Sequence, residues 1–336
     1  FMFGMGDTPF ACRSAACALL VYLSCIFITA NYLTALPDYK SVVAGFCIGY
    51  AASCAAAYGG SLWAGAAGAL CGFAAGHALL FFAVLAALAK GLGRQTAPDW
   101  SILAYVRAFP SLILCGLLYN FGMWVDKIMF WWFSRQHVQI CGLMYAVPDY
   151  DKAIYLSLLS IVPGLTVFFL DIETDFARHY KSFFRAVLED GSLDQIVQER
   201  RAIAVSLREG MYRLFKVQAV VTAGLVLFAD RIASIVGIGA VQLGIFRITL
   251  FGAFLLVVFL SLLTALFYAD DRRSALACCA VFVVANAALS LATLLKNEAW
   301  YGFGFVIAAG LGMIIAGWRV NRRMGELEYY IFAAQR

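Results

Sequence analysis

Nine apolar stretches of this chain are each long enough to cross a lipid bilayer. A helix needs about 20 mostly apolar residues to cross a hydrocarbon core about 30 Å thick. The nine stretches are Ala15–Leu36, Val42–Tyr58, Leu62–Leu88, Ile102–Phe133, Ala153–Leu170, Met211–Ala229, Leu243–Tyr268, Ser274–Leu295 and Tyr301–Trp318. In lipid, a segment of this kind satisfies its own backbone donors and acceptors only as a helix. The sequence therefore predicts an all-α polytopic membrane protein with about nine transmembrane helices.

Composition excludes a soluble fold. Hydrophobic residues make up 63% of the chain and charged residues 13%, and the mean hydropathy is +0.84. Soluble domains have about 45–50% apolar residues and about 25% charged ones. A soluble fold of this composition would have almost no polar surface to cover its core.

The distribution of Lys and Arg predicts how the spans are oriented. When the links are assigned alternately to the two sides, one side holds fifteen basic residues, namely Lys40, Lys90, Arg94, Arg178, Lys181, Arg185, Arg200, Arg201, Arg208, Arg272, Arg273, Arg319, Arg322, Arg323 and Arg336. The other side holds four, namely Arg13, Arg135, Lys152 and Lys296. Because basic loops stay in the cytoplasm, we expect a cytoplasmic C-terminus. The net charge of +5 then reflects topology, and we do not expect binding to nucleic acid.

The spacing of the spans predicts two bundles. Residues 1–90 hold three spans, 91–101 form a cytoplasmic linker, and 102–336 hold six spans, a cytoplasmic helical insert at 173–209 and a cytoplasmic tail. The chain opens at Phe1 on the outer side without a signal-peptide pattern. If both bundles have six helices, three further spans precede Phe1, and residues 1–90 are the last three helices of an N-terminal bundle.

Signatures of enzymes and cofactor sites are missing from the sequence. Ten cysteines are scattered without a C-x-x-C pair, and the three histidines are far apart. No phosphate-binding G-x-x-x-x-G-K-[ST] loop and no G-x-S-x-G motif occurs. We therefore expect no catalytic residues, no cofactor and no metal site. A membrane-embedded transferase would need a convergent His/Asp or Ser/His pair, which no single span contains.

The fourth span carries the most unusual polar residues. Ile102–Phe133 is 32 residues long, or about 48 Å as a straight helix, so it must tilt, kink near Pro110 or project outward. Asp126 and Lys127 are costly in a membrane, so we expect them to face the protein interior or a watery cavity. Helical periodicity places Lys127 on one face with three other residues. These are Asn120, Trp124 and Trp131.

Two interpretations of this face stay open. It can be a polar, aromatic strip along a transport path that contacts sugar hydroxyls and apolar sugar faces. Alternatively, Trp124, Trp131 and Trp132 belong to an interfacial belt, and Asp126 pairs with a basic residue elsewhere to lock helices together. The transport interpretation requires the ionisable side chains to turn toward a wet lumen.

A second polar cluster follows a predicted bend at Pro163. Asp171, Glu173 and Asp175 end the fifth span. They can form an acidic rim at the cytoplasmic mouth of a pore, or a solvated helix end with local ion pairs. The insert that follows has the apolar spacing of an amphipathic helix, from Phe176 to Val187. It then has a capping box, Ser192–Gln195, that begins a second helix. Such a hairpin can bind a cytoplasmic protein or cover the base of the bundle.

Several motifs together resemble the PelG family of the bacterial Pel exopolysaccharide system. They are Leu118-Tyr119-Asn120-x-Gly122-x-Trp124-x-Asp126-Lys127-x-x-Phe130-Trp131, Tyr150-Asp151, Leu159-Ser160-Ile161-x-Pro163-Gly164, Ile172-Glu173-Thr174-Asp175-Phe176, Gly191-Ser192-Leu193, Tyr301-Gly302-Phe303-Gly304-Phe305 and Glu328-Tyr329-Tyr330-x-Phe332-x-x-Gln335. The match runs from about Ile102 to the end, and members of that family are longer at the N-terminus.

This resemblance implies both a fold and a function. The fold is that of the flippases and multidrug exporters, with twelve helices in two bundles around a central cavity. The function is export of an N-acetylhexosamine-rich polymer across the bacterial inner membrane, in the building of a biofilm matrix. The implied partners are the polysaccharide, a cytoplasmic glycosyltransferase and inner-membrane regulatory proteins, one of which senses cyclic di-GMP. The family supplies no defined catalytic set.

The source of energy is predicted from what the spans lack. A proton- or cation-coupled exporter should bury acids near mid-membrane, but Asp126 and Asp230 are near span ends and no phosphate-binding loop occurs. We therefore expect a passive conduit, through which polymer synthesis pushes the chain. The alternatives are a gradient-driven flippase for lipid-linked oligosaccharides, whose coupling acids would lie upstream of Phe1, and a non-transporting membrane scaffold for the synthase.

Overall fold

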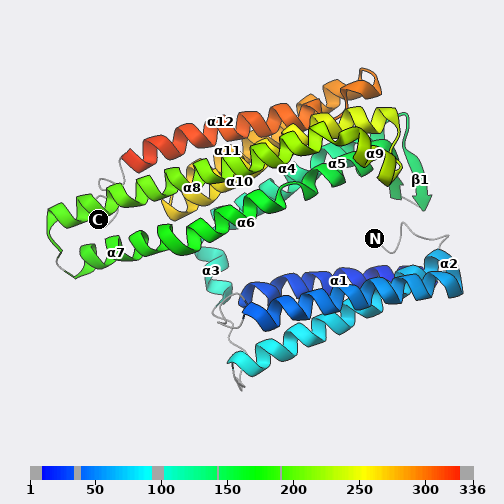
Figure 1. The fold of residues 1–336 in the computed structure, drawn as a ribbon, viewed down its shortest axis with the longest axis horizontal. Coiled ribbons are helices and arrows are strands. Elements are labelled where there is room, and N and C mark those ends of the chain that lie inside the picture. Colours follow the sequence, from blue (N-terminus) through cyan, green and yellow to red (C-terminus); the bar gives the residue numbers. More distant parts are fainter. Residues whose placement is uncertain (1–9, 34–38, 93–101, 142–143, 190, 326–336) are drawn as a thin grey trace. The chain divides into compact units, whose positions relative to one another are not determined.

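The computed structural model describes residues 10–33, 39–92, 102–141, 144–189 and 191–325. These residues are almost entirely helical (Figure 1). Eight helices are long and apolar enough to cross a membrane, namely Phe10–Leu33, Val43–Lys90, Pro110–Phe133, Pro148–Leu188, Leu193–Leu227, Ala240–Tyr268, Arg272–Leu294 and Glu298–Arg323. The predicted all-α polytopic membrane class is confirmed.

The chain forms two compact units. The first contains α1 (Phe10–Leu33) and α2 (Tyr39–Leu92), and residues 139–144 are grouped with it. The second contains the remaining elements, from Ile102 onward. The predicted three-helix end of a longer N-terminal bundle stays a prediction.

Helix α2 contains two of the predicted spans. Its backbone leaves the helical conformation at Ala64 and Gly65, where Gly65 has a φ of 58°. The two arms then run back along each other in close contact. A Cβ at Gly60 would overlap the Gly68 carbonyl, and one at Gly72 would overlap Ala56. Small residues at such positions let two membrane helices approach closely.

The second unit begins with a broken span. Helices α3 (Ile102–Ala108) and α4 (Pro110–Phe133) meet at Phe109, and Pro110 occupies the first turn of α4. Proline has no amide hydrogen and fits a first helical turn, where that group would be unpaired anyway. Of the alternatives for this long span, the structure shows the break at Pro110. A hairpin of β1 (Val138–Cys141) and β2 (Met144–Ala146) follows α4.

The next span is interrupted at the predicted bend. Helix α5 (Pro148–Leu159) ends before Ser160, and α6 (Val162–Asp171) has Pro163 in its first turn. The fully buried side chain of Gln218 donates a hydrogen bond of 3.0 Å to the Ser160 carbonyl. Pro163 cannot supply a backbone donor to this turn, so a side chain from another helix supplies one.

The predicted insert is helical and continuous with the spans on both sides. After a π-helical turn, η2 (Ile172–Phe176), come α7 (Ala177–Leu188) and α8 (Leu193–Leu227). Both hydrogen bonds of the predicted capping box at Ser192 and Gln195 are present. The second insert helix and the span expected at Met211 form one helix of 35 residues. Phe176 and Phe183 are buried, so the apolar face of the insert packs inside the unit.

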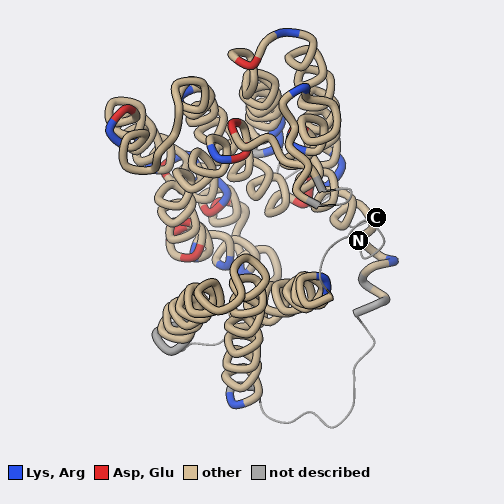
Figure 2. Tube along the Cα trace, turned by 90° about the vertical axis from the view of Figure 1, so that its right-hand side faces the viewer, with Lys and Arg blue, Asp and Glu red and all other residues tan. Residues whose placement is uncertain are grey.

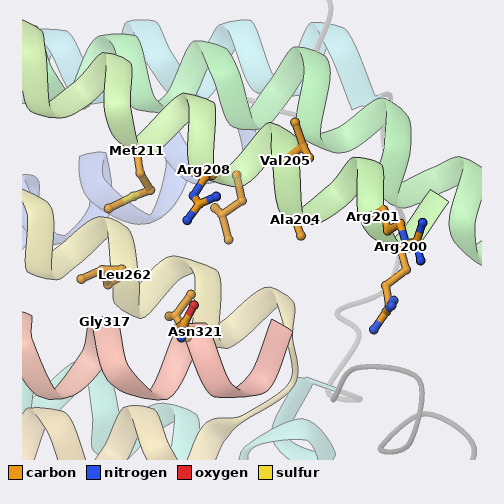
Figure 3. A pocket seen from close by; sticks show the side chains of 11 residues that line it. Arg200, Arg201, Ala204, Val205, Arg208, Met211, Leu262, Gly317 and Asn321 are labelled. Carbon is orange, nitrogen blue, oxygen red and sulfur yellow. The ribbon is translucent and has the colours of Figure 1, made fainter. Parts of the chain in front are cut away.

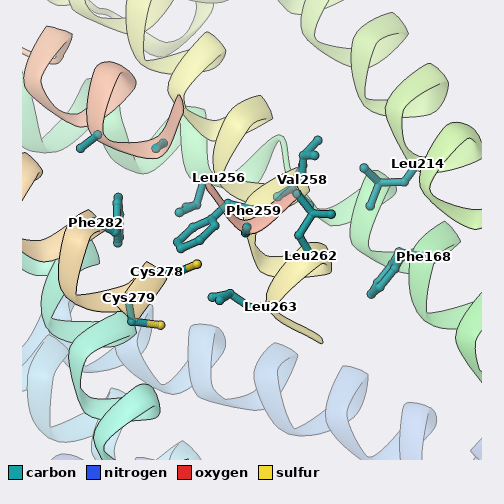
Figure 4. Packing of buried hydrophobic residues seen from close by; sticks show 14 of the residues in the cluster. Phe168, Leu214, Leu256, Val258, Phe259, Leu262, Leu263, Cys278, Cys279 and Phe282 are labelled. Carbon is teal, nitrogen blue, oxygen red and sulfur yellow. The ribbon is translucent and has the colours of Figure 1, made fainter. Parts of the chain in front are cut away.

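The core of the second unit is centred on α10 (Ala240–Tyr268). After α8 comes the short α9 (Ala229–Val236), and after α10 come α11 (Arg272–Leu294), the 3₁₀ turn η3 (Glu298–Trp300) and α12 (Phe303–Gly325). Figure 4 shows Phe259 and Leu263 of α10 near Cys278, Cys279 and Phe282 of α11. A helix that is apolar on all sides is expected to be buried, and α10 has the largest buried share of the candidate spans.

Figure 2 shows the charged residues as short blue and red segments on helices that are otherwise uncharged. In the described part of the first unit, the only charged residues are Arg13, Lys40 and Lys90. In the second unit, α7, the first half of α8, the start of α11 and the end of α12 hold most of the basic residues that the sequence placed on one side. We call this the basic end of the unit.

Candidate functional site

The polar residues of α4 are divided between a buried and an exposed layer. Asp126 is 0% exposed and Lys127 is 6% exposed. On the adjoining face, Trp124 is 50% exposed. Asn120 is also exposed, and its amide donates to the Gly116 carbonyl one turn earlier at 2.9 Å. The helix thus presents an amide and an indole outward, with a charged pair behind them.

Asp126 and Lys127 bind each other and the neighbouring helix. The Lys127 ammonium lies 3.3 Å from one Asp126 carboxylate oxygen and donates to the Met123 carbonyl at 2.7 Å. The buried Tyr150 hydroxyl, on α5, donates a short hydrogen bond to Asp126. A buried ion pair is tolerated only when hydrogen bonds satisfy both partners. These contacts do so, and they tie α4 to α5.

Aromatic rings complete the surroundings of the ammonium. Lys127 Nζ lies 5.9 Å from the ring centre of Trp124 and 5.7 Å from that of Phe305 on α12. A cation within about 6 Å of a ring centre is attracted by the ring quadrupole. Both hydrogen-bond partners and rings therefore stabilise the charge where water is excluded. Of the two environments expected from the sequence, the protein interior or a watery cavity, Asp126 and Lys127 have the first. The transport interpretation therefore rests on the exposed residues of the same helix and not on this ion pair.

Trp131 connects the exposed face to a second carboxylate. Its ring lies 6.1 Å from that of Trp124, and its indole nitrogen donates to both oxygens of Asp151, at 3.0 and 2.9 Å. Asp151 also accepts from the Val147 amide at 2.9 Å. Two tryptophans and a partly exposed carboxylate thus lie together at the junction of α4 and α5.

A stacked aromatic pair holds this junction against η3 and α12. The rings of Phe130 and Tyr301 stack with centres 4.5 Å apart, and Phe130 meets Tyr150 edge to face at the same separation. The Tyr301 hydroxyl is 3.0 Å from the hydroxyl of Ser134. All four of these side chains are buried, so they hold the backbone of α4 in place behind Trp124 and Trp131.

The three predicted mouth acids are separated by their partners. Asp171 accepts from Arg213 of α8 at 2.9 Å, and Asp175 lies 3.8 Å from Arg213 and 3.6 Å from Arg178. Glu173 is exposed. The Asp175–Arg178 pair is a local ion pair of the kind expected for a solvated helix end. Arg213 forms long-range pairs that join the end of α6 and η2 to α8.

Metal and thiol chemistry finds no support in the described residues. Among them, no group of three His, Cys, Asp or Glu side chains could hold a metal ion. Nine of the ten cysteines, all except Cys141 at the end of β1, are free thiols.

Comparison with protein families decides the identity of the chain. Residues 1–332 match the family model of PelG, described as "Putative exopolysaccharide Exporter (EPS-E)". The chain belongs to the PelG family. The match includes residues 1–101, which the sequence motifs had left out. Searches of curated proteins and of solved structures found no match. A PelG-family chain with these helices is a multi-pass membrane protein of exopolysaccharide export.

Sequence reasoning missed part of the PelG-family site. Tyr150, Asp151, Tyr301 and Phe305 surround the α4 residues, but none was a candidate for the transport path. The motifs Tyr150-Asp151 and Tyr301–Phe305 stood out in the sequence without a role. A signal was available in the acids that begin α5, because carboxylates beside a membrane span need partners.

Proposed function

We propose that this chain carries an N-acetylhexosamine-rich exopolysaccharide from the cytoplasm to the periplasm across the bacterial inner membrane. The family description supports export of an exopolysaccharide. The observation that carries the proposal further is the half-exposed pair of Trp124 and Trp131, which is backed by a buried ion pair. Rigid aromatic rings suit the apolar face of a sugar ring, and neighbouring amide and carboxylate groups suit its hydroxyls.

The roles of the α4 residues follow from their exposure. Trp124 and Asn120 contact the polymer directly, because both are exposed. Trp131 and Asp151 form the edge of the same surface. Asp126 and Lys127 act from behind as positioning residues, since Asp126 is fully buried and the Lys127 side chain is almost so.

Polymer synthesis supplies the driving force in this proposal. Asp126 pairs with Lys127 and accepts from Tyr150, and these contacts favour a structural role for it. A cytoplasmic glycosyltransferase would push the growing chain through a passive conduit. Inner-membrane regulatory proteins, one of them sensing cyclic di-GMP, would control the synthase. Glu173, beside the π-helical turn, remains the exposed acid at the proposed cytoplasmic mouth.

Substitution of Trp124 tests the proposed sugar-contact surface. In cells that depend on this protein for export, Trp124→Ala should lower secreted polymer by about tenfold, which corresponds to about 1.4 kcal/mol. Trp132→Ala is the matched control, because Trp132 is also exposed, at 61%, but lies about 100° around the helix from Trp131. Polymer is normalised to the amount of exporter in the membrane.

The same experiment separates transport from a scaffold role. A scaffold should keep exporting with either alanine variant, provided that the glycosyltransferase still co-purifies with it. Equal export by Trp124→Ala and Trp132→Ala, at equal membrane abundance, would overturn the proposed surface. A gradient-driven flippase is separated in vesicles. Export that continues at full rate with synthesis stopped and an ion gradient imposed would refute the passive conduit.

A further inference from the structure

A cavity at the basic end of the second unit is lined by arginines and aliphatic side chains. Its volume is about 520 Å³, and it lies between α8 and α12, above Leu262 of α10 (Figure 3). The lining residues are Arg200, Arg201, Ala204, Val205, Leu207, Arg208, Met211, Leu262, Gly317, Val320 and Asn321. This set includes three arginines, no acid and no aromatic ring. The proposed sugar-contact surface consists instead of Trp124, Trp131, Asn120 and Asp151. None of these residues lines the cavity, so the two are separate.

The cavity has a polar and an apolar end. Figure 3 shows Met211, Leu262 and Gly317 toward one end and Arg200 and Arg201 toward the other, with Arg208 between them. The order follows the sequence of α8, in which Arg208 precedes Met211 by three residues, or about 4.5 Å. The apolar span predicted from the sequence begins at Met211. The arginines therefore begin where the hydrocarbon core ends.

The arginine side chains are available to a ligand. Arg201 and Arg208 are both exposed. A guanidinium group matches a phosphate with two parallel hydrogen bonds and binds it better than an ammonium does. A cluster of basic groups between membrane helices is the kind of site that binds anionic lipid headgroups.

A second cavity at the same end differs in its charge balance. It has a volume of about 560 Å³ and is lined at the α10–α11 turn by both acids and arginines. There Asp270 accepts two bonds from Arg272, at 2.7 and 3.0 Å, and Arg323 lies 3.9 Å from Asp271. That cavity has internal counter-ions, whereas the lining of the α8–α12 cavity contains none.

We propose that the α8–α12 cavity binds an anionic phospholipid of the bilayer, with its phosphate on Arg201 and Arg208 and its glycerol and upper acyl carbons against Met211, Leu262 and Gly317. The charge complementarity selects a phosphate, and the apolar end selects a membrane amphiphile over a soluble anion. A bound lipid occupies the space between α8 and α12. This site is independent of the proposed export path.

Lipid binding to the full-length protein tests the proposal. The protein is placed in nanodiscs of phosphatidylcholine that contain a small fraction of phosphatidylglycerol, and bound phosphatidylglycerol is measured by native mass spectrometry. The double variant Arg201→Gln/Arg208→Gln should lower the affinity about 25-fold, at about fivefold for each arginine near the membrane surface. The matched control is Arg135→Gln/Arg231→Gln, which removes two exposed arginines outside the cavity and should change the affinity less than twofold.

A second variant tests the apolar end while the arginines remain. Gly317→Leu should fill that end without a backbone clash, because a Cβ there would meet only Leu262, at 3.7 Å. It should weaken phosphatidylglycerol binding at least fivefold. Circular dichroism verifies that each variant is folded.

The outcomes separate a lipid from a soluble anion. If glycerol phosphate competes as well as the lipid does, and Gly317→Leu has no effect, the site binds a soluble phosphate and the lipid proposal is overturned. Equal phosphatidylglycerol binding by the wild type and by the Arg201/Arg208 variant would overturn it as well. These experiments measure lipid binding and not export. Their result is therefore valid even where the proposed export function is wrong.

Discussion

Asp126 and Lys127 matter to this chain first as a structural pair. Each would be costly alone in a membrane, and together with Tyr150 they join α4 to α5 without exposure to water. A charge that is left unpaired after removal of its partner costs far more than the pair contributes. The residue-scale prediction therefore concerns stability more than transport.

Removal of the ammonium should destabilise the protein strongly. Lys127→Met leaves the Asp126 carboxylate buried without its cation, so we expect a loss of about 3–5 kcal/mol in unfolding free energy. The double variant Asp126→Asn/Lys127→Met should recover most of the loss, because Asn can still accept from Tyr150. Unfolding in detergent micelles, followed by tryptophan fluorescence, measures both. Equal stability of the single and double variants would contradict the pairing.

At the element scale, periodicity predicted helix faces well and turns poorly. The insert face of Phe176 and Phe183 and the Ser192 cap are as predicted, since both are local patterns. The turn of the first hairpin is not, because the spans Val42–Tyr58 and Leu62–Leu88 predict a link at Gly59 and Gly60. They lie within α2, where Gly60 allows close approach of the arms, and the reversal needs the positive φ of Gly65.

The candidate site shows the same limit. The α4 strip was predicted because its residues share one helix, whereas Tyr150 and Asp151 lie on α5, beyond the β1–β2 hairpin. No sequence period relates positions on two different helices, so the pairing of Asp126 with Tyr150 and of Trp131 with Asp151 needed the structure. Burial of Lys127 was one of the two expected environments, but the contact of its ammonium with Phe305 of α12 also needed the structure.

Two glycines of α4 should respond differently to the same substitution. A Cβ at Gly122 would lie 2.6 Å from the ring of Phe282, which is fully buried in α11. Gly122→Ala should therefore destabilise the α4–α11 packing by about 1–3 kcal/mol. Gly116 has nothing within 4 Å of its Cβ position, and Gly116→Ala should be neutral or should stabilise the helix by up to about 1 kcal/mol.

Thermal unfolding of the two alanine variants measures this difference. Gly116→Ala also serves as the control for helix propensity, because both glycines lie in one helix. An unaffected Gly122→Ala variant would show that α4 does not pack on α11 through Gly122.

At the scale of the whole molecule, the basic end fixes the expected orientation. The helix α7, the first half of α8, the start of α11 and the end of α12 carry clustered Lys and Arg, and such segments are retained in the cytoplasm. The proposed lipid cavity and the proposed mouth acids lie toward this end, so both assignments depend on one topology. The opposite end has η3 and the short link Leu295–Asn297.

Protease sites inserted at the two ends should report opposite sides of the membrane. A site inserted after Glu189, at the end of α7, should resist protease added to intact spheroplasts and be cut after lysis, because the excess of positive charge holds that end in the cytoplasm. A site inserted after Asn297 should be cut in intact spheroplasts. Both insertions fall at exposed turns, so each protein should still reach the membrane. Cleavage after Glu189 in intact spheroplasts would show that the topology is the reverse of the one expected here. The direction of transport that we propose would then be contradicted as well.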